Sequence, residues 1–308
     1  MRDIQSIAIV GAGALGAMYA ARFFDHDPSS VFLVAGGDRK RRLEKEGVFV
    51  NDRQYRVSVK NPSGPDAPAD LILVGVKYLQ LDQAIADAAR FVGPHTQVLS
   101  VMNGIDSEER IADRFGWNKT LYCVALGMDP LREGNRVRVT QEGRLLFGEA
   151  QNRGQSERLK PICALFDRCG IAWEIPDDMI RSLWWKYMIN VGVNQCSAVT
   201  GAPFGVFQRS KEARALMDSA MDEVIAVAEA KGIGLSEADI EKWHPILAGL
   251  SPEGKTSMLQ DIDAGRRTEV DMFAGILVKM GEALGIDTPV NRALLRIIRV
   301  MEALRREA

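Results

Sequence analysis

Closely spaced cysteines and histidines are missing from this sequence of 308 residues. Four cysteines are scattered without any CxxC pair, and the chain has three histidines. A zinc site needs clustered ligands of these two types, and a disulfide framework needs a small chain that is dense in cysteine. We therefore expect no metal ion and no disulfide framework, which is typical of a protein from the reducing cytoplasm.

Long apolar runs and a strong charge of one sign are missing as well. No run of 18 apolar residues occurs, and glycine interrupts the apolar segment near the start, so we expect neither a membrane span nor a signal peptide. The formal net charge is -2, which gives nucleic acids and anionic membranes no electrostatic attraction. The expected partner is a small molecule.

A glycine-rich loop follows the first predicted strand, residues 7–10, and opens a predicted helix over residues 17–24. It consists of Gly11, Ala12, Gly13, Ala14, Leu15 and Gly16. In this position GxGxxG is typical of a dinucleotide site: Gly11 permits the tight turn, Gly13 lets a pyrophosphate approach, and Gly16 lets helix and strand pack. The free N–H groups at the helix start would bind the phosphates. A plain glycine turn is the alternative.

Further apolar runs predict an α/β domain around this loop. Residues 31–35, 71–76 and 97–102 are apolar without alternation, which is typical of parallel strands covered on both faces. Residues 121–149 contain period-2 stretches with a central turn, so we expect antiparallel strands added to the same sheet, and residues 171–175 predict one more strand. The pattern favours a Rossmann-type dinucleotide-binding domain.

The residues after the second strand bear on the choice of cofactor. An acidic side chain there would bond the ribose 2′-OH of NAD. This sequence instead places Arg39 and Lys40 at the head of a run of four cations, which favours the 2′-phosphate of NADP. Asp38 keeps NAD as the less favoured cofactor, and a solvated helix start is the alternative to any phosphate contact.

Two polar positions lie where later strands should open onto the ligand. Lys77 follows the third apolar run, and Asn103 with Gly104 follows the fourth. The carboxyl ends of parallel strands line the ligand crevice of such folds, so both side chains can bond ribose, carboxamide or substrate. For Asn103 a plain Asn-Gly turn is the alternative.

The chain changes character after Pro176, and almost all of the remaining residues are predicted to be helical. The expected helices span residues 180–198, 210–231, 236–247, 252–264, 268–284 and 289–305. We therefore predict a Rossmann NADP-binding domain at residues 1–176 and an all-helical substrate domain at residues 177–308. The last helix has one apolar face, which can pack internally or pair with a second chain as a homodimer.

Three polar residues recur at a spacing of four inside the apolar segment 181–201. Lys186, Asn190 and Asn194 would share one helix face, drifting by about 40° per step. A lysine ammonium can stabilise and protonate the alkoxide that forms when hydride reaches a carbonyl carbon. The asparagines can each donate and accept, as a hydroxy acid requires. A solvated helix face is the alternative.

A second polar cluster lies at residues 255–271. We expect Gly265 to end one helix and Thr268 to begin the next, with Asp271 completing a capping box. Glu269 would then lie in a first turn, where a negative charge is favoured by the helix dipole alone.

Taken together, these motifs resemble the ketopantoate reductase family. The similarity rests on GAGALG, on VK after the third strand, on NG after the fourth, on LWWKYMINVGVN and on SMLQDIDAGRRTEVD, in the same order across nearly the whole chain. The resemblance implies NADPH-dependent reduction of 2-dehydropantoate to (R)-pantoate, on the route to pantothenate and coenzyme A.

The resemblance also implies residue roles. Lys186 is the implied general acid and Glu269 assists near the substrate hydroxyl. The implied substrate contacts are Asn190, Asn194, Ser257 and Asn103, and the implied cofactor contacts include Lys77 and Asn103. Two positions depart from the family: Gly36 stands where an arginine commonly binds the 2′-phosphate, and Gly254 stands where many members have an asparagine.

Two other functions stay open on this basis. One is a paralogous reductase that acts on another 2-oxo acid, which the departure at Gly254 would fit. The other is a non-catalytic NADP(H) sensor, for which Lys186 would have no reaction to assist.

Overall fold

The computed structural model describes residues 3–64 and 67–307, without the side chains of the last two of these, and the chain divides into two compact units. The first unit ends at Ser182 and the second begins at Leu183. This division lies inside helix α6 (Met179–Ile189), six residues after the predicted boundary at residue 176.

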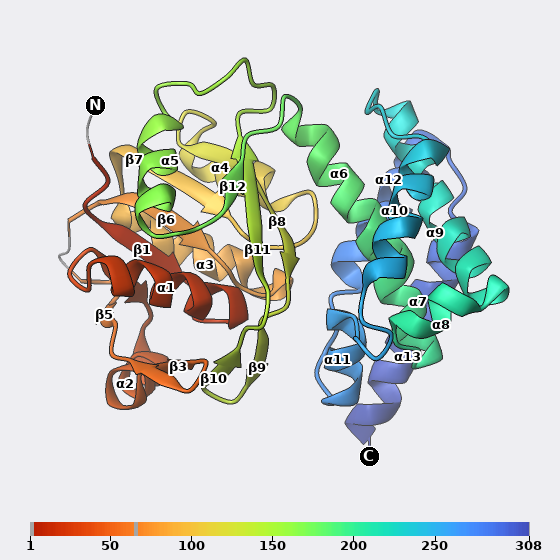
Figure 1. The fold of residues 1–308 in the computed structure, drawn as a ribbon, viewed down its shortest axis with the longest axis horizontal. Helices are drawn as coiled ribbons and strands as arrows, with labels where there is room; N and C mark the ends of the chain where they lie inside the picture. Colours follow the sequence, from red (N-terminus) through yellow and green to blue (C-terminus); the bar gives the residue numbers. More distant parts are fainter. Residues whose placement is uncertain (1–2, 65–66, 308) are drawn as a thin grey trace. The chain divides into compact units, whose positions relative to one another are not determined.

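The main sheet of the first unit runs in the order β12-β11-β8-β7-β6-β1-β2-β5 (Figure 1). Its strands are β1 (Ile7–Val10), β2 (Val31–Val34), β5 (Ser58–Lys60), β6 (Ala69–Val74), β7 (Val92–Ser100), β8 (Thr120–Met128), β11 (Glu142–Gly148) and β12 (Trp173–Glu174). The strands β5, β2, β1, β6, β7 and β8 are parallel, and β11 runs antiparallel to β8.

Helices cover both faces of this sheet, which explains why its central strands β1 and β2 are apolar throughout. Along β1, Ile7 and Ile9 pack into one core with α1 (Ala14–His26) and α5 (Lys160–Arg168). Ala8 and Val10 pack into the other core with α3 (Leu81–Ala88) and α4 (Ser107–Phe115). The predicted doubly covered α/β domain is confirmed.

The remaining elements of this unit are short. They are α2 (Gly37–Glu46), the single turns η1 (Tyr78–Gln80) and η2 (Ala89–Phe91), and the strands β3 (Val48–Val50), β4 (Arg53–Tyr55), β9 (Leu131–Glu133) and β10 (Arg136–Arg138).

The hairpin of β9 and β10 corrects one prediction. It does not extend the main sheet but joins a second, smaller sheet in the order β4-β3-β10-β9. Gly127 and Gly143 both have positive φ where β8 ends and β11 begins, and a Cβ at Gly143 would lie 2.0 Å from the Leu126 carbonyl oxygen. This close crossing bends the chain out of the main sheet, so that β10 pairs with β3.

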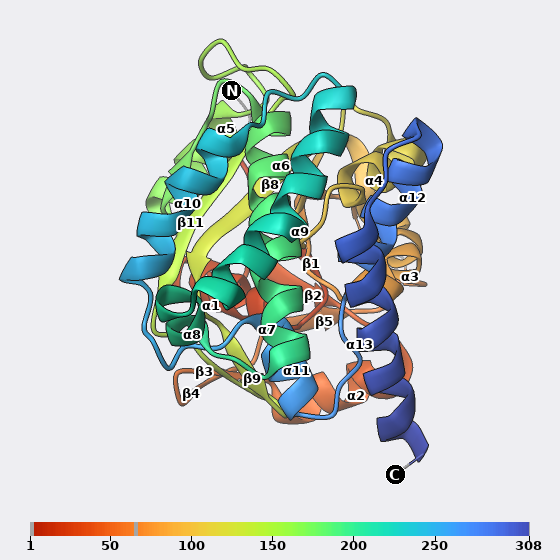
Figure 2. The same ribbon diagram turned by 90° about the vertical axis from the view of Figure 1, so that its right-hand side faces the viewer.

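The second unit consists of helices and helical turns, as predicted. Beyond α6 they are η3 (Asn190–Asn194), α7 (Gln195–Thr200), α8 (Phe204–Arg209), α9 (Lys211–Ala230), α10 (Glu237–Gly249), α11 (Ser257–Asp263), η4 (Asp271–Gly275), α12 (Ile276–Leu284) and α13 (Pro289–Glu307). Helix α13 packs beside α9 (Figure 2).

Three predicted helices differ from the observed ones. The first is interrupted by the π-helical turn η3, and the predicted helix over 252–264 begins only at Ser257. The helix predicted from residue 268 begins with the π-turn η4 at Asp271, whose carboxylate accepts hydrogen bonds from Arg267 and Arg299 and forms no capping box. Charged partners from a distant helix outweigh the local capping interaction.

A buried polar network holds the core of the second unit together. Gln195, which is fully buried, donates to the side chain of Asn291 at 3.0 Å. Asn291 in turn donates to Glu223 of α9 at 2.7 Å, and the same carboxylate accepts the backbone N–H groups of Val290 and Asn291 at the start of α13. A negative charge at a helix N-terminus is favoured, so this network fixes three helices together.

Three further predictions concern membrane spans, cysteines and the last helix. Within residues 3–64 and 67–307, no helix is both long and apolar enough to cross a membrane. The four cysteines are buried thiols.

Helix α13 buries Leu294 and Ile298 but exposes Ile297, Val300 and Leu304, so one apolar stripe is left uncovered in the single chain. The homodimer stays a prediction.

Glu108, in the first turn of α4, is a buried acid whose titration should govern the pH dependence of folding. It is 1% exposed and accepts hydrogen bonds from the Ser107 hydroxyl at 2.8 Å and the Cys123 N–H at 3.4 Å. Burial outweighs these bonds and raises the pKa of Glu108 to about 7.

The raised pKa predicts a loss of stability as pH increases. The unfolded chain releases the Glu108 proton near its ordinary pKa of about 4.3, whereas the folded chain keeps it until about pH 7, so the free energy of unfolding falls through this window by up to roughly 3 kcal/mol. Urea unfolding at pH 5, near the lower end of this window, and at pH 8, about one unit above it, should show most of this fall, and Glu108→Gln should reduce it. An equal pH dependence in both proteins would contradict the assignment.

Candidate active site

Three glycines shape the loop between β1 and α1. Gly11 has a φ of 106°, and a Cβ there would lie 2.4 Å from the Gly75 carbonyl oxygen. A Cβ at Gly16 would lie 1.8 Å from the Gly11 carbonyl oxygen. Only hydrogen fits at these positions, and α1 therefore begins at Ala14 directly against the strand ends. The N–H groups of its first turn have no acceptor within the helix and can bind an anion.

The cations after β2 separate into two kinds. Lys40 pairs with Glu44 at 3.5 Å and Arg41 pairs with Asp38. Arg39 is half-buried and lies close enough to Arg42 for the two charges to interact: burial lowers the pKa of Arg39 and the Arg42 charge lowers it further. Both predicted phosphate contacts, Arg39 and Lys40, stay predictions, and Lys40 already has a carboxylate partner.

Lys77 and Asn103 lie in two loops that one hydrogen bond joins. Lys77 precedes the turn η1, whose Tyr78 hydroxyl donates to the Asp106 carboxylate at 3.0 Å. Asp106 lies three residues after Asn103, in the loop where Gly104 has a φ of 97°. The loop after β7 leaves Asn103 half-buried, and its predicted contact with cofactor or substrate stays a prediction beside the plain turn.

Lys186 is half-buried on α6, and the two asparagines follow it through the π-turn η3. The Asn194 amide donates to the Asn190 side-chain oxygen at 3.4 Å, so the two side chains lie together. A step of four residues is slightly more than one turn of an α-helix but slightly less than one turn of the wider π-helix. From Asn190 to Asn194, η3 therefore reverses the predicted rotation of the polar residues around the helix axis. The amide nitrogen of Asn190 is buried and has no hydrogen-bond partner among the described residues. An unsatisfied buried donor is costly and is suited to a bound oxygen.

The segment that carries Glu269 is fixed against the helix that carries Lys186. The Tyr187 hydroxyl donates to the Phe273 carbonyl at 2.7 Å, and the Ala274 N–H donates to the Gln195 side chain at 3.2 Å. Both bonds are buried, and both join the region of η3 to η4. The second unit therefore brings together the two segments that contain the predicted catalytic residues.

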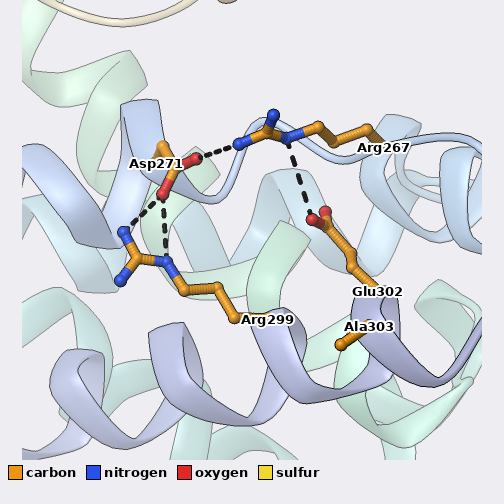
Figure 3. A pocket seen from close by; sticks show the side chains of 5 residues that line it. All are labelled: Arg267, Asp271, Arg299, Glu302 and Ala303. Atoms are coloured by element: carbon orange, nitrogen blue, oxygen red, sulfur yellow. Dashed lines mark hydrogen bonds and ion pairs between the residues drawn. The ribbon is translucent and has the colours of Figure 1, made fainter. Parts of the chain in front are cut away.

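Helix α13 holds the neighbours of Glu269 on both sides (Figure 3). Glu302 accepts from the Thr268 N–H at 2.8 Å and from its hydroxyl at 2.6 Å, while Arg299 donates to Asp271 at 2.6 Å. Burial opposes ionisation of Asp271, but Arg299 and Arg267 outweigh it and lower its pKa. These side chains line a hollow of about 270 Å³.

Ser257 and Gly254 lie in the approach to α11. Ser257 is the first residue of that helix, and its side chain is exposed. A Cβ at Gly254 would lie 3.0 Å from both the Phe204 ring and the Ser251 carbonyl oxygen. The loop packs tightly against α8, so a side chain at position 254 would require its neighbours to shift by a few tenths of an ångström.

Matches to known proteins agree with this architecture. The family described as "Ketopantoate reductase PanE/ApbA" matches residues 7–152, and its C-terminal part, "Ketopantoate reductase PanE/ApbA C terminal", matches residues 178–302. The chain belongs to the ketopantoate reductase family. It is therefore an oxidoreductase, which removes the non-catalytic sensor as an interpretation.

Individual ketopantoate reductases are distant relatives in sequence. The 2-dehydropantoate 2-reductase of Pyrococcus horikoshii is 26% identical over 97% of this chain and 98% of its own length. The ketopantoate reductase structure from Ralstonia eutropha superposes with a TM-score of 0.85 at 27% identity, covering 98% of this chain and 99% of that one. D-mandelate dehydrogenase with NADH and anilino(oxo)acetate has a TM-score of 0.88 at 21% identity, covering 98% of this chain and 99% of that one, which shows the same fold.

Several residues around the site were not predicted. No role was predicted from the sequence for Tyr187, Gln195, Arg132 or Glu302. The one available signal was Gln195, because a glutamine at an apolar helix position needs a buried partner. The others depend on segments 34 to 120 residues away along the chain.

The two hydrogen bonds from Thr268 to Glu302 predict that the protein loses stability when the Glu302 carboxylate is removed. Glu302→Ala leaves the Thr268 N–H and hydroxyl without their acceptor, so the free energy of unfolding should fall by about 1–3 kcal/mol and amide exchange at Thr268 should accelerate. Glu302→Gln retains an acceptor oxygen, so its free energy of unfolding should fall much less. If the alanine variant matches the wild type in urea unfolding and in exchange at Thr268, α13 does not hold this segment.

Proposed function

We propose that this chain reduces 2-dehydropantoate to (R)-pantoate with NADPH, on the route to pantothenate and coenzyme A. The observation that carries the proposal is the fixed arrangement of α6, η3 and η4, which joins the segment of Lys186 to the segment of Glu269 through Tyr187 and Gln195. Family membership supports the reaction class.

The first unit supports a nicotinamide dinucleotide as the cofactor. The close approach of Gly11 and Gly16 to neighbouring backbone leaves the start of α1 bare, which fits a pyrophosphate. Ala14, Leu15 and Gly16 would donate backbone N–H groups to it, and Lys77 and Asn103 would contact its ribose and carboxamide. When bound, the reduced nicotinamide supplies the hydride.

The second unit supplies the groups that act on the substrate in this proposal. Lys186 stabilises the negative charge that develops on the carbonyl oxygen and transfers a proton to it. The orphaned amide of Asn190 donates to a substrate oxygen, with Asn194 beside it. Glu269 accepts from the substrate hydroxyl, and the exposed hydroxyl of Ser257 contacts the carboxylate.

A different 2-oxo acid is the second candidate substrate. The tight packing at Gly254 removes the donor that the asparagine of other members would provide, and D-mandelate dehydrogenase shares this fold at 21% identity. The free thiols of the four cysteines support our assignment of the reaction to the cytoplasm.

The test of the proposed substrate is a comparison of kcat/KM across 2-oxo acids. With saturating NADPH, we expect 2-dehydropantoate to exceed 2-oxo-2-phenylacetate, the oxo acid of mandelate, by at least about tenfold, because hydroxyl recognition gives large discrimination. Asn190→Ala should reduce this ratio, because it removes the donor proposed for the substrate. A higher kcat/KM for the phenyl acid, or no turnover of 2-dehydropantoate, would overturn the specific substrate.

A further inference from the structure

Three arginines meet beside the glycine-rich loop of the first unit. Arg39 and Arg42 are three residues apart on α2, so they share one helix face. Arg132 comes from β9 of the smaller sheet, and its guanidinium donates to the Ala12 carbonyl in the middle of the loop. The hairpin that left the main sheet thus returns to the dinucleotide site.

The three positive charges lie close enough to affect one another. Burial lowers the pKa of Arg132, and the charges of Arg39 and Arg42 lower it further. Burial and then the Arg42 charge lower the pKa of Arg39, and they outweigh the Asp87 carboxylate, which raises it. Like charges that are partly removed from water repel, so this arrangement is unfavourable until an anion joins it.

The nearby carboxylates offset the charge of the cluster only in part, because Asp87 favours the charged form of Arg39 but its effect is smaller than those of burial and Arg42. Asp38 pairs with Arg41 and Glu44 pairs with Lys40, and within residues 3–64 and 67–307 none of the three clustered arginines forms an ion pair. Arg132 uses two of its five N–H groups, on the Ala12 and Gly134 carbonyl oxygens. About three remain for a ligand.

The position of the cluster indicates which anion it binds. Gly36 stands between the end of β2 and the start of α2, and a Cβ there would meet Pro62 and Asn61 no closer than 3.7 Å. In a dinucleotide fold the adenosine ribose lies at the end of this strand. A ribose with a phosphate on its 2′-oxygen would place that group among guanidinium groups, which bind phosphate in a planar, two-pronged geometry.

We propose that Arg39, Arg42 and Arg132 form the binding site for the 2′-phosphate of NADP. Arg39 and Arg42 come from the helix after β2, and Arg132 is a specificity residue contributed by β9 of the smaller sheet. The site replaces the arginine that the family commonly has at position 36 and leaves Lys40 to its pair with Glu44. This inference rests on the proposed use of a nicotinamide dinucleotide and is independent of the identity of the 2-oxo acid.

The test measures dissociation constants for NADPH and NADH without substrate, by isothermal titration calorimetry. Arg132→Gln and Arg39→Gln should each weaken NADPH by ~10–100-fold, because each removes charge-assisted hydrogen bonds to phosphate. NADH should change by less than about threefold, and adenosine 2′,5′-bisphosphate should follow NADPH. Arg41→Gln, a charge loss on the same helix, is the matched control and should leave both constants unchanged.

The outcomes separate this inference from the proposed reaction. Equal weakening of NADPH and NADH by Arg132→Gln would mean that Arg132 only supports the loop at Ala12, and it would overturn the inference. An unchanged NADPH constant, or a wild type that prefers NADH, would overturn it as well. Failure to reduce 2-dehydropantoate would leave these binding constants, and therefore the inference, intact.

Discussion

Two buried hydrogen bonds, which join η4 to residues before and after η3, are the constraint on which the proposed chemistry depends. Tyr187 follows Lys186 and Gln195 follows Asn194, and both bond the backbone of the segment after Glu269. A buried carbonyl or N–H that loses its partner costs about 1–3 kcal/mol, so neither segment can shift alone. The π-turns in both segments change the helix geometry at this junction, which is common at functional sites.

The first unit depends on a comparable constraint of a steric kind. Gly11, Gly16 and Gly75 bring three backbone segments into contact, and no side chain fits between them. This contact places the start of α1, the end of β6 and the loop before α4 at the same edge of the sheet. Arg132 adds a fourth segment by bonding the Ala12 carbonyl, so the small sheet contributes to the site as well as to stability.

The parts that the sequence predicted correctly depend on local patterns. Unalternating apolar runs predict strands that are covered on both faces, and GxGxxG between a strand and a helix predicts a backbone contact that only glycine allows. The all-helical second domain follows from apolar periodicity in the same way. The polar stripe was also visible, because Lys186, Asn190 and Asn194 are separated by one turn each.

The parts that the sequence did not predict depend on distant segments. The capping box at Thr268 was a reasonable local expectation, but Glu302 and Arg299 of α13 bind Thr268 and Asp271 instead. The hairpin of β9 and β10 has the alternation of an ordinary sheet edge, and only the crossing at Gly143 directs it to β3. No propensity indicates the π-turns, since their register follows from packing such as that of Gly192 against Met221.

The central claim is that Lys186 acts on the reacting carbonyl. Its most direct test is a measurement of kcat for the Lys186→Met variant, with the Lys279→Met variant as the matched control. Lys279 is an exposed lysine of α12 in the same unit. The account predicts that Lys186→Met lowers kcat for 2-dehydropantoate by ~10²–10⁴-fold while the NADPH dissociation constant and the melting temperature stay unchanged. Lys279→Met should keep full activity. An unchanged kcat in Lys186→Met would contradict the account.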